Sequence, residues 1–585
     1  MSVKVAEIQQ AFAQDDGAAW VSNLWDKYNN QRREKIEEWK ELRDYVFATD
    51  TSTTTNSSLP WKNSTTLPKL CQIRDNLHSN YLSALFPNDN WLRWEAYSED
   101  DATKEKARTI QGYISNKSRE GNLRETASQL LYDYIDYGNA LGTTVFESKY
   151  REMSDGSYIP SFIGPKAIRI SPLDIVFNPL ASSFEESFKV VRSVKTVGEV
   201  MKMAMEEPDN GFWTEALLNR EELKAKAGGY TVEDFDKAVG YQADGFGSMH
   251  EYLQSDYMEV LEFFGDYRTA DGALHTDRMI TVVDRSYTVR NEEIPSWLGS
   301  APIYHVGWRK RPDNLWAMGP LDNLVGMQYR IDHLENLKAD AMDLIVHPPL
   351  KIIGEVEEFV WGPNEEIQID ENGDVQELGK SLNGILGADN QIEFLESRME
   401  LYAGAPREAM GMRTAGEKTA FEVQQLANAA GRIFQEKITA FEINLLEKLV
   451  NSMLETSCRN MDKADVIRVL DDEYGVEEFL TITKEDITAS GKLRPVGARY
   501  FSKQAQDLQN LIGVFNSPIA NMILPHTSGK EMTKVVEDVA GLSGYKLFKA
   551  NVAVTEQAET QALAQQAQSD LQAEQAAIQT QAEVV

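Results

Sequence analysis

The sequence predicts an α+β protein that is mainly helical and divided into several domains. Long segments place apolar residues three and four positions apart, which is typical of amphipathic helices. Between residues 158 and 310 the pattern changes to short β-type runs. At 585 residues and 42% apolar composition, the chain is long enough to bury more than one hydrophobic core.

The N-terminal segment is predicted to form amphipathic helices. From residue 20 to residue 47, apolar side chains follow a helical spacing and opposite charges lie three and four residues apart, so we expect one surface helix. A second helix is predicted after Pro68. It stops before Pro87, because proline cannot continue a helix.

The following region is predicted to mix helices and strands. Trp91 and Trp94 are interpreted as core residues, since isolated tryptophans usually serve packing. Residues 125 to 150 predict a helix that ends near Gly138 and runs into a strand. Among the later β-type runs, helices are expected near 196 to 228.

A long helix, a small β module and a returning helix are predicted next. The segment GPLDNLVGMQYRIDHLENLKADAMDLIVHPPL keeps a helical period for about seven turns and ends at Pro348 and Pro349. Asn372 and Gly373 separate two alternating runs, which is a strong hairpin signal. Because QIEFLESRMELYAG is again helical, the sequence predicts a β module at the far end of a helical stalk.

A loop rich in small and basic residues follows the returning helix. It contains Arg407, Arg413 and Lys418. Thr419 and Glu422 have the spacing of a capping box, in which the threonine caps the next helix and the glutamate reaches back to the cap. We therefore predict a mobile basic loop in front of a long capped helix.

This loop also comes close to a phosphate-binding P-loop. Its glycines have the right separation, but Glu417 lies between Gly416 and Lys418, so a carboxylate occupies the position of a phosphate. The later segment DVIRVLDDE resembles a Walker B strand, yet Arg468 interrupts its apolar run. A P-loop must also leave a strand, whereas this loop follows a helix. Nucleotide hydrolysis is therefore disfavoured.

Composition excludes several other classes. Lys and Arg number 59 against 92 Asp and Glu, and the formal charge of −33 disfavours tight DNA binding but allows DNA to be touched without being gripped. Cys71 and Cys458 give no disulfide framework, which indicates a reducing compartment. No signal peptide or membrane span is expected. Without an H-E-x-x-H motif, a Cys/His cluster or a nucleophile elbow, the sequence predicts no catalytic, cofactor or metal site.

The order of these parts resembles the portal (head-to-tail connector) proteins of tailed bacteriophages, of the short-tailed type. The most specific segments are YHVGWRKRPDNLWAMGPLDNLVGMQ (304 to 328) and APREAMGMRTAGEKTAFEVQ (405 to 424). The resemblance implies a wing at 1–317, stem helices at 318–346 and 388–403, a clip at 347–387, a tunnel loop at 404–418, a long wing helix at 419–458, a crown at 459–550, and a C-terminal helical barrel or disordered tail at 551–585.

The resemblance also implies a function without catalysis. The family forms a ring of twelve copies at one capsid vertex, after synthesis in the bacterial cytoplasm. The ring nucleates assembly with major capsid and scaffold proteins and docks the large subunit of the packaging terminase. It conducts double-stranded DNA and later binds tail adaptor proteins. The alternatives are another virion component such as an adaptor and, less favoured, a P-loop-like packaging ATPase.

Candidate site residues follow from the same resemblance. Arg407, Arg413 and Lys418 are predicted to make weak contacts with DNA phosphates, or equally to pair with Glu408, Glu417 or a neighbouring subunit. The remaining candidates are the clip residues Phe359, Val360, Trp361, Asn372 and Gly373, facing partners or packed between subunits, and a stem-surface or, preferably, inter-subunit cluster of Arg309, Lys310 and Arg311.

Overall fold

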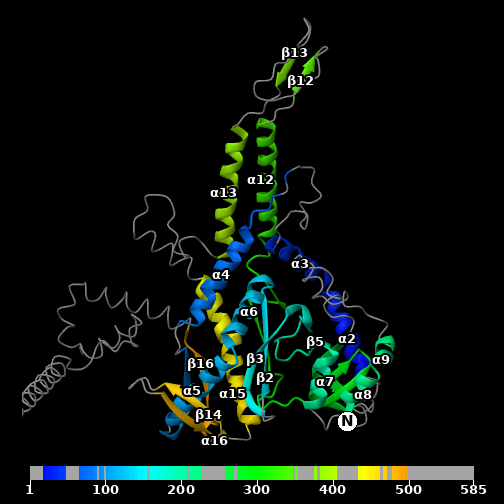
Figure 1. Ribbon diagram of the computed structural model, residues 1–585, viewed down its shortest axis with the longest axis vertical. Coiled ribbons are helices and arrows are strands. Elements are labelled where there is room, and N and C mark those ends of the chain that lie inside the picture. Colours follow the sequence, from blue (N-terminus) through cyan, green and yellow to red (C-terminus); the bar gives the residue numbers. More distant parts are fainter. Residues whose placement is uncertain are drawn as a thin grey trace, which may run out of the picture. The chain divides into compact units, whose positions relative to one another are not determined.

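The computed structural model describes helices and antiparallel strands, with more helix than strand, which confirms the α+β class (Figure 1). Nearly all of the described residues belong to one compact unit, formed by residues 1–469 and 479–498. The described residues are 17–47, 63, 65–87, 91–97, 101–153, 158–206, 211–226, 257–268, 273–346, 350–353, 374–377, 383–404, 433–461, 465–470, 477–488 and 490–497.

The N-terminal segment forms two helices where one was predicted. α2 (Gly17–Gln31) and α3 (Arg33–Phe47) are separated at Arg32. The Arg32 guanidinium is buried and donates to the carbonyl oxygens of Pro172 and Leu173 at 2.5 and 2.6 Å. The single-helix prediction was wrong because the apolar period continues through the break, while the break itself depends on a contact with distant residues.

A five-stranded antiparallel sheet carries helices on both faces. α2 covers one face, packing on Leu261 and Phe263, and α7 (Val197–Glu206) packs on the other, near Met258 and Val260. Alternate side chains of one strand thus reach opposite cores. α8 (Gly211–Leu218) and α9 (Arg220–Lys226) pack on the same face as α7. The strands, in order, are β4 (Ile175–Phe177), β5 (Lys189–Thr196), β6 (Tyr257–Arg268), β7 (Leu274–Val283) and β8 (Tyr287–Glu293).

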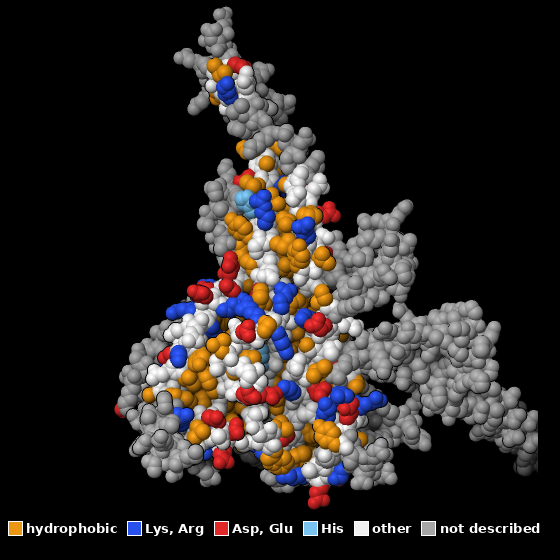
Figure 2. All heavy atoms as spheres, turned by 180° about the vertical axis from the view of Figure 1, so that it is seen from behind, with side chains coloured by type: hydrophobic (Ala, Val, Ile, Leu, Met, Phe, Trp, Pro, Cys, Tyr) orange, Lys and Arg blue, Asp and Glu red, His pale blue; other side chains and the backbone are white. Residues whose placement is uncertain are grey.

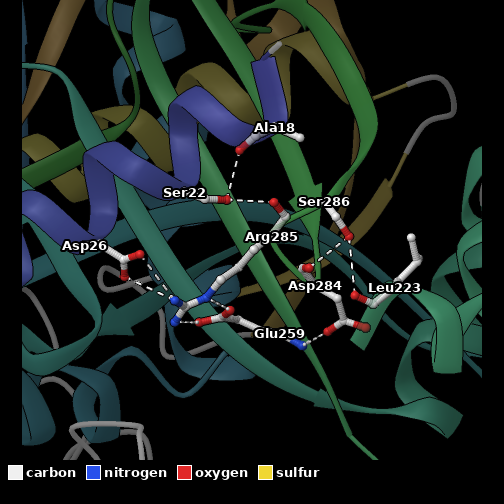
Figure 3. A network of polar contacts seen from close by, with 8 residues as sticks. All are labelled: Ala18, Ser22, Asp26, Leu223, Glu259, Asp284, Arg285 and Ser286. Carbon is white, nitrogen blue, oxygen red and sulfur yellow. Dashed lines mark hydrogen bonds and ion pairs between the residues drawn. The ribbon is translucent and has the colours of Figure 1, made fainter. Parts of the chain in front are cut away.

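A polar network fastens α2 to the turn between β7 and β8 (Figure 3). Asp284 and Arg285 adopt left-handed backbone, with φ of 46° and 60°, and this closes the turn. Arg285 Nε donates to the fully buried Glu259 at 2.6 Å, and its Nη1 donates to Asp26 of α2 at 3.1 Å. The Ser22 hydroxyl donates to the carbonyl oxygen of Arg285 at 2.9 Å.

A three-stranded sheet in the order β3-β2-β9 forms the centre of the body. Gly138 joins α6 (Leu123–Asp136) to β2 as predicted, with φ of 69°, and a Cβ there would lie 2.3 Å from the Gly319 nitrogen. Only glycine fits this close approach. The strands are β2 (Asn139–Glu152), β3 (Tyr158–Ile170) and β9 (Ile303–Gly307).

The long helix behind this sheet is described from residue 433 to residue 460 and contains a π-helical segment, Glu442–Leu446. That segment lets the adjacent residues Leu445 and Leu446 both be buried. Ile433, at the described start of this helix, is 48% exposed. The core beside this helix also includes residues of α4 (Lys69–Leu85) and α5 (Asp101–Glu120). As predicted, α4 lies between Pro68 and Pro87.

Distant parts of the chain meet where β1 (Leu92–Ala96) pairs antiparallel with β16 (Gly491–Pro495). Trp91 and Trp94 are buried, as predicted. Residues 459–469 and 479–498 belong to the same compact unit as the body. In this part of the molecule α16 (Lys484–Ile487) contacts α5.

Candidate functional site

Two helices that pack side by side form the candidate functional surface (Figure 1). α12 (Val325–Val346) and α13 (Asn383–Ala403) carry β12 (Leu350–Ile353) and β13 (Asp374–Glu377) beyond their adjoining ends. β12 and β13 pair antiparallel with each other.

The helices begin at positions that differ from the expected 318 and 388. The first is shorter because Gly319 packs against the Ile135 carbonyl oxygen, where a Cβ would be 2.8 Å away, and Leu324 N–H then closes a turn on Leu321 O at 2.8 Å. The chain must complete this turn before α12 can start. α13 is longer than expected and begins at Asn383.

The helix pair is apolar on its outer surface as well as between the helices. Ile331, Ile392 and Met399 are buried in the core that the pair shares with the body. Figure 2 shows apolar side chains along the outside of the pair. Such a patch on a lone chain is typical of an interaction site. The exposed apolar residues of the pair are Leu337 (45%), Met342 (49%), Val346 (68%), Phe394 (48%), Leu401 (61%) and Tyr402 (54%), and β12 adds Ile352 (51%) and Ile353 (43%).

A row of polar side chains runs along α12 and binds the backbone of an extended segment. Residues four apart lie on one helix face, so their side chains can contact successive residues of an extended segment beside the helix. We call the segment formed by Asn63 and residues 65–68 the strap. We call the row the polar ladder, which consists of Gln328, Asp332, Asn336 and Asp340.

The outer half of the polar ladder pairs with the strap in the manner of a β-strand. Asn336 accepts the Thr65 N–H at 2.7 Å and donates to the Thr65 carbonyl oxygen at 3.2 Å. Asp340 accepts from the backbone and the side chain of Asn63 at 3.1 and 2.7 Å. The ladder therefore satisfies backbone groups that no neighbouring strand reaches in the described part of the strap.

The inner half of the ladder leads into the start of α4. Asp332 Oδ1 accepts from Leu67 N–H at 3.0 Å and from the Gln328 amide at 2.9 Å. Gln328 also donates to the Leu67 carbonyl oxygen at 2.6 Å and accepts from Leu70 N–H at 3.3 Å. Leu70 lies in the first turn of α4, so Gln328 satisfies one of the amide groups that a helix start leaves unpaired.

Asp332 is the member of the polar ladder whose negative charge is least favourable. It is fully buried, and its Oδ2 has no hydrogen-bond partner within the described ranges. Burial raises the pKa of Asp332 to about 7, although the hydrogen bonds from Leu67 and Gln328 favour the carboxylate. Its protonation state therefore changes near neutral pH.

A buried ion pair ties the start of α4 to α13. Lys69 Nζ lies 2.6 Å from Glu400 Oε1 and 3.9 Å from Glu396, and both Lys69 and Glu400 are buried. Together with the strap, this pair connects both helices of the candidate surface to the N-terminal part of the body.

The structure describes one of the predicted groups of site residues. Arg309, Lys310 and Arg311 form β10 (Arg309–Arg311), which pairs with β11 (Asn314–Met318), and all three side chains are exposed. The guanidinium of Arg309 lies 5.2 Å from the Trp308 ring.

The other predicted site residues lie outside the described residues, so their contacts stay predictions. They are the loop cations Arg407, Arg413 and Lys418, the cap residues Thr419 and Glu422, and the clip residues Phe359, Val360, Trp361, Asn372 and Gly373.

The Walker B-like segment forms β14 (Asp465–Leu470), whose neighbour among the described strands is β15 (Glu477–Ile482). A nucleotide-binding strand would instead lie inside a larger parallel sheet. Where side chains are described, no group of three or more His, Cys, Asp or Glu residues is placed to hold a metal ion.

The polar ladder is a feature that the sequence analysis missed. Its signal was present, because Gln328, Asp332, Asn336 and Asp340 recur every fourth residue on a predicted helix. A polar row at this spacing ordinarily indicates a solvated face, and nothing local showed that an extended segment covers it.

None of the described helices has the length and apolarity needed to cross a bilayer. Comparison with models of protein families and with curated proteins finds no match for this chain.

Proposed function

We propose that this chain is a portal protein: a subunit of a closed ring at one capsid vertex that conducts double-stranded DNA during packaging and ejection. One observation carries the proposal. A pair of long helices, α12 and α13, leaves an α+β body, exposes large apolar side chains, and carries a small strand pair beyond its ends. In the proposal, the helix pair is the stem of a portal and the strand pair belongs to its clip. The α+β body is the wing.

The exposed apolar residues support a ring. Leu401 and Tyr402 on α13, and Met342 and Val346 on α12, are each about half exposed or more, which is costly for a chain that works alone. Packing α12–α13 of one copy against those of the next would bury them. Repeating a head-to-tail contact of this kind with a closing rotation gives a ring.

The charge of the chain supports a conduit rather than a tight DNA-binding protein. Each phosphate contact by a cation releases counterions and adds affinity, so a strongly basic wall would hold DNA in place. A formal charge of −33 avoids this. In the proposal, Arg407, Arg413 and Lys418 make the few phosphate contacts in the channel, and the ring performs no catalysis.

The proposed partners are those of a portal. The strand pair and its neighbouring residues face the packaging terminase and later the tail adaptor proteins, and the body contacts the major capsid and scaffold proteins. The second candidate is a different virion component, such as an adaptor. The packaging ATPase is less favoured, since β14 has one described neighbour and Glu417 displaces Lys418 from its place in a P-loop.

Imaging of the purified full chain by negative-stain electron microscopy tests the proposal. We expect rings with twelve-fold symmetry and a central opening wide enough for a DNA duplex. A nucleotide-hydrolysis assay on the same rings, with Lys418→Ala as the control, should give no activity that depends on Lys418. A chain that stays monomeric, or a Lys418-dependent hydrolysis, would overturn the proposal.

A further inference from the structure

β10 presents a cluster of cations in a strongly acidic chain. Arg309, Lys310 and Arg311 are exposed, and none of them forms an ion pair with an acidic side chain in the described ranges, including Asp313 in the adjoining turn. Cations elsewhere in the body commonly have a carboxylate partner. With a formal charge of −33, three adjacent cations that lack one stand out from the rest of the described surface.

The backbone of this cluster is held rigidly. Trp308 is 3% exposed, its backbone N–H donates to the Gly138 carbonyl oxygen at 2.8 Å, and its Nε1 donates to the Tyr81 hydroxyl at 3.2 Å. The Trp308 ring lies 5.2 Å from the Arg309 guanidinium and 5.3 Å from Lys437 Nζ. Lys437 of the long helix is thus a second cation near this ring, and it also pairs with Glu436 at 3.2 Å.

The segment that carries the cations leads into the helix pair. β11 ends at Met318 and α12 begins at Val325. Trp308, which precedes the cations, belongs to the same buried core as Ile331 of α12 and Met399 of α13. The base of the cluster is therefore joined to the helix pair, whose exposed apolar residues we propose to be covered by a second copy.

We infer that the basic cluster, formed by Arg309, Lys310 and Arg311, docks on an acidic surface of an adjacent copy of this chain and sets the register between the two copies. The inference rests on the proposed function, since it requires a ring. A neighbouring copy supplies the missing carboxylates, because each copy carries 92 acidic residues. DNA is the less suitable occupant, since the remaining charge of the chain repels it.

The physical role of the cluster is to offset repulsion between copies. Chains of the same negative charge resist association, and complementary contacts at a rim raise the association rate and select one register. Such contacts are exposed, so salt screens them. The advantage that the cluster gives to assembly should thus shrink as salt rises.

The test compares two full-length triple variants with equal charge. The first carries Arg309→Glu, Lys310→Glu and Arg311→Glu. The control carries Arg33→Glu, Arg124→Glu and Lys202→Glu, at exposed positions on other helices. Ring formation is followed by mass photometry across protein concentrations, at low and high salt, with circular dichroism to verify folding. A milder triple variant to Gln serves if the Glu variant folds poorly.

The cluster variant should need at least about tenfold more protein than the control for half assembly, since an exposed ion pair contributes a factor of about two to five and three are lost. Because the two variants have equal net charge, the difference between them should shrink at high salt. Equal assembly of the two variants would overturn the inference and leave the proposed function intact. A wild-type chain without rings would overturn both. Normal rings that lose binding to a short DNA duplex would show a DNA site and overturn the inference.

Discussion

Replacing Asp332 by asparagine should change how the stability of the protein depends on pH. Asp332 is fully buried beneath the strap, and burial raises the pKa of its carboxyl group to about 7 from 3.8. The folded state therefore holds this proton more tightly than the unfolded state. The resulting stability is fully present below the unfolded pKa and is lost as the pH rises through the folded pKa. The Asp332→Asn side chain would keep the acceptor for Leu67 N–H but carry no charge.

The magnitude follows from the two pKa values. A difference of about 3 units corresponds to at most about 4 kcal/mol between acidic and basic pH. About half of it, roughly 2 kcal/mol, falls between about pH 5.5 and about pH 8.5, a range that stays above the sequence pI of ≈ 4.7. The amide of the variant has no acceptor at the position of Oδ2, which costs about 1–3 kcal/mol, but that cost is the same at every pH.

Hydrogen exchange on the full chain gives the local opening free energy of the strap and of the first turn of α4. The stability of Asp332→Asn relative to wild type should rise by about 2 kcal/mol from about pH 5.5 to about pH 8.5. Asp343→Asn is the matched control, because Asp343 lies exposed at the outer end of the same helix face and contacts Asn63 at 2.9 Å. Parallel pH curves for wild type and Asp332→Asn would refute the reasoning.

Three further predictions concern single contacts. Arg285→Ala should destabilise the five-stranded sheet by about 3 kcal/mol and expose α2 to proteases, because it breaks an ion pair with the buried Glu259; equal protease resistance in both proteins would contradict this. Lys189→Met should stabilise the protein by up to about 3 kcal/mol below pH 8, since burial lowers the pKa of Lys189 to about 8 from 10.5. That gain should shrink between the two pKa values, and chemical denaturation at pH 7 and pH 10 measures it. Leu401→Asp with Tyr402→Asp should abolish rings while circular dichroism stays unchanged, since both side chains are exposed in the single chain; intact rings would remove the helix pair from the interface.

Local signals in the sequence predicted many of the elements. Pro68 and Pro87 bracket α4, and Gly138 marks the change from α6 to β2. These predictions succeed because a proline ring or a left-handed glycine acts on its immediate neighbours. The break at Arg32 was missed, because the carbonyl groups that bind its guanidinium come from residues 172 and 173.

The candidate surface was predictable in outline and not in detail. The helical period predicted α12, and the loop and clip candidates rest on the resemblance, since their residues lie outside those described. The polar ladder required the knowledge that Thr65 and Leu67 lie along α12, more than 260 residues away in sequence.

The sequence by itself determined many of the segments that become helices and strands, because period, proline and glycine act within a few residues. Only the tertiary structure decided that β1 pairs with β16, that the strap covers a polar row on α12, and that Leu401 and Tyr402 stay outside the core. These features depend on which distant surfaces meet when the whole chain packs. A residue's neighbours in sequence carry no information about that meeting.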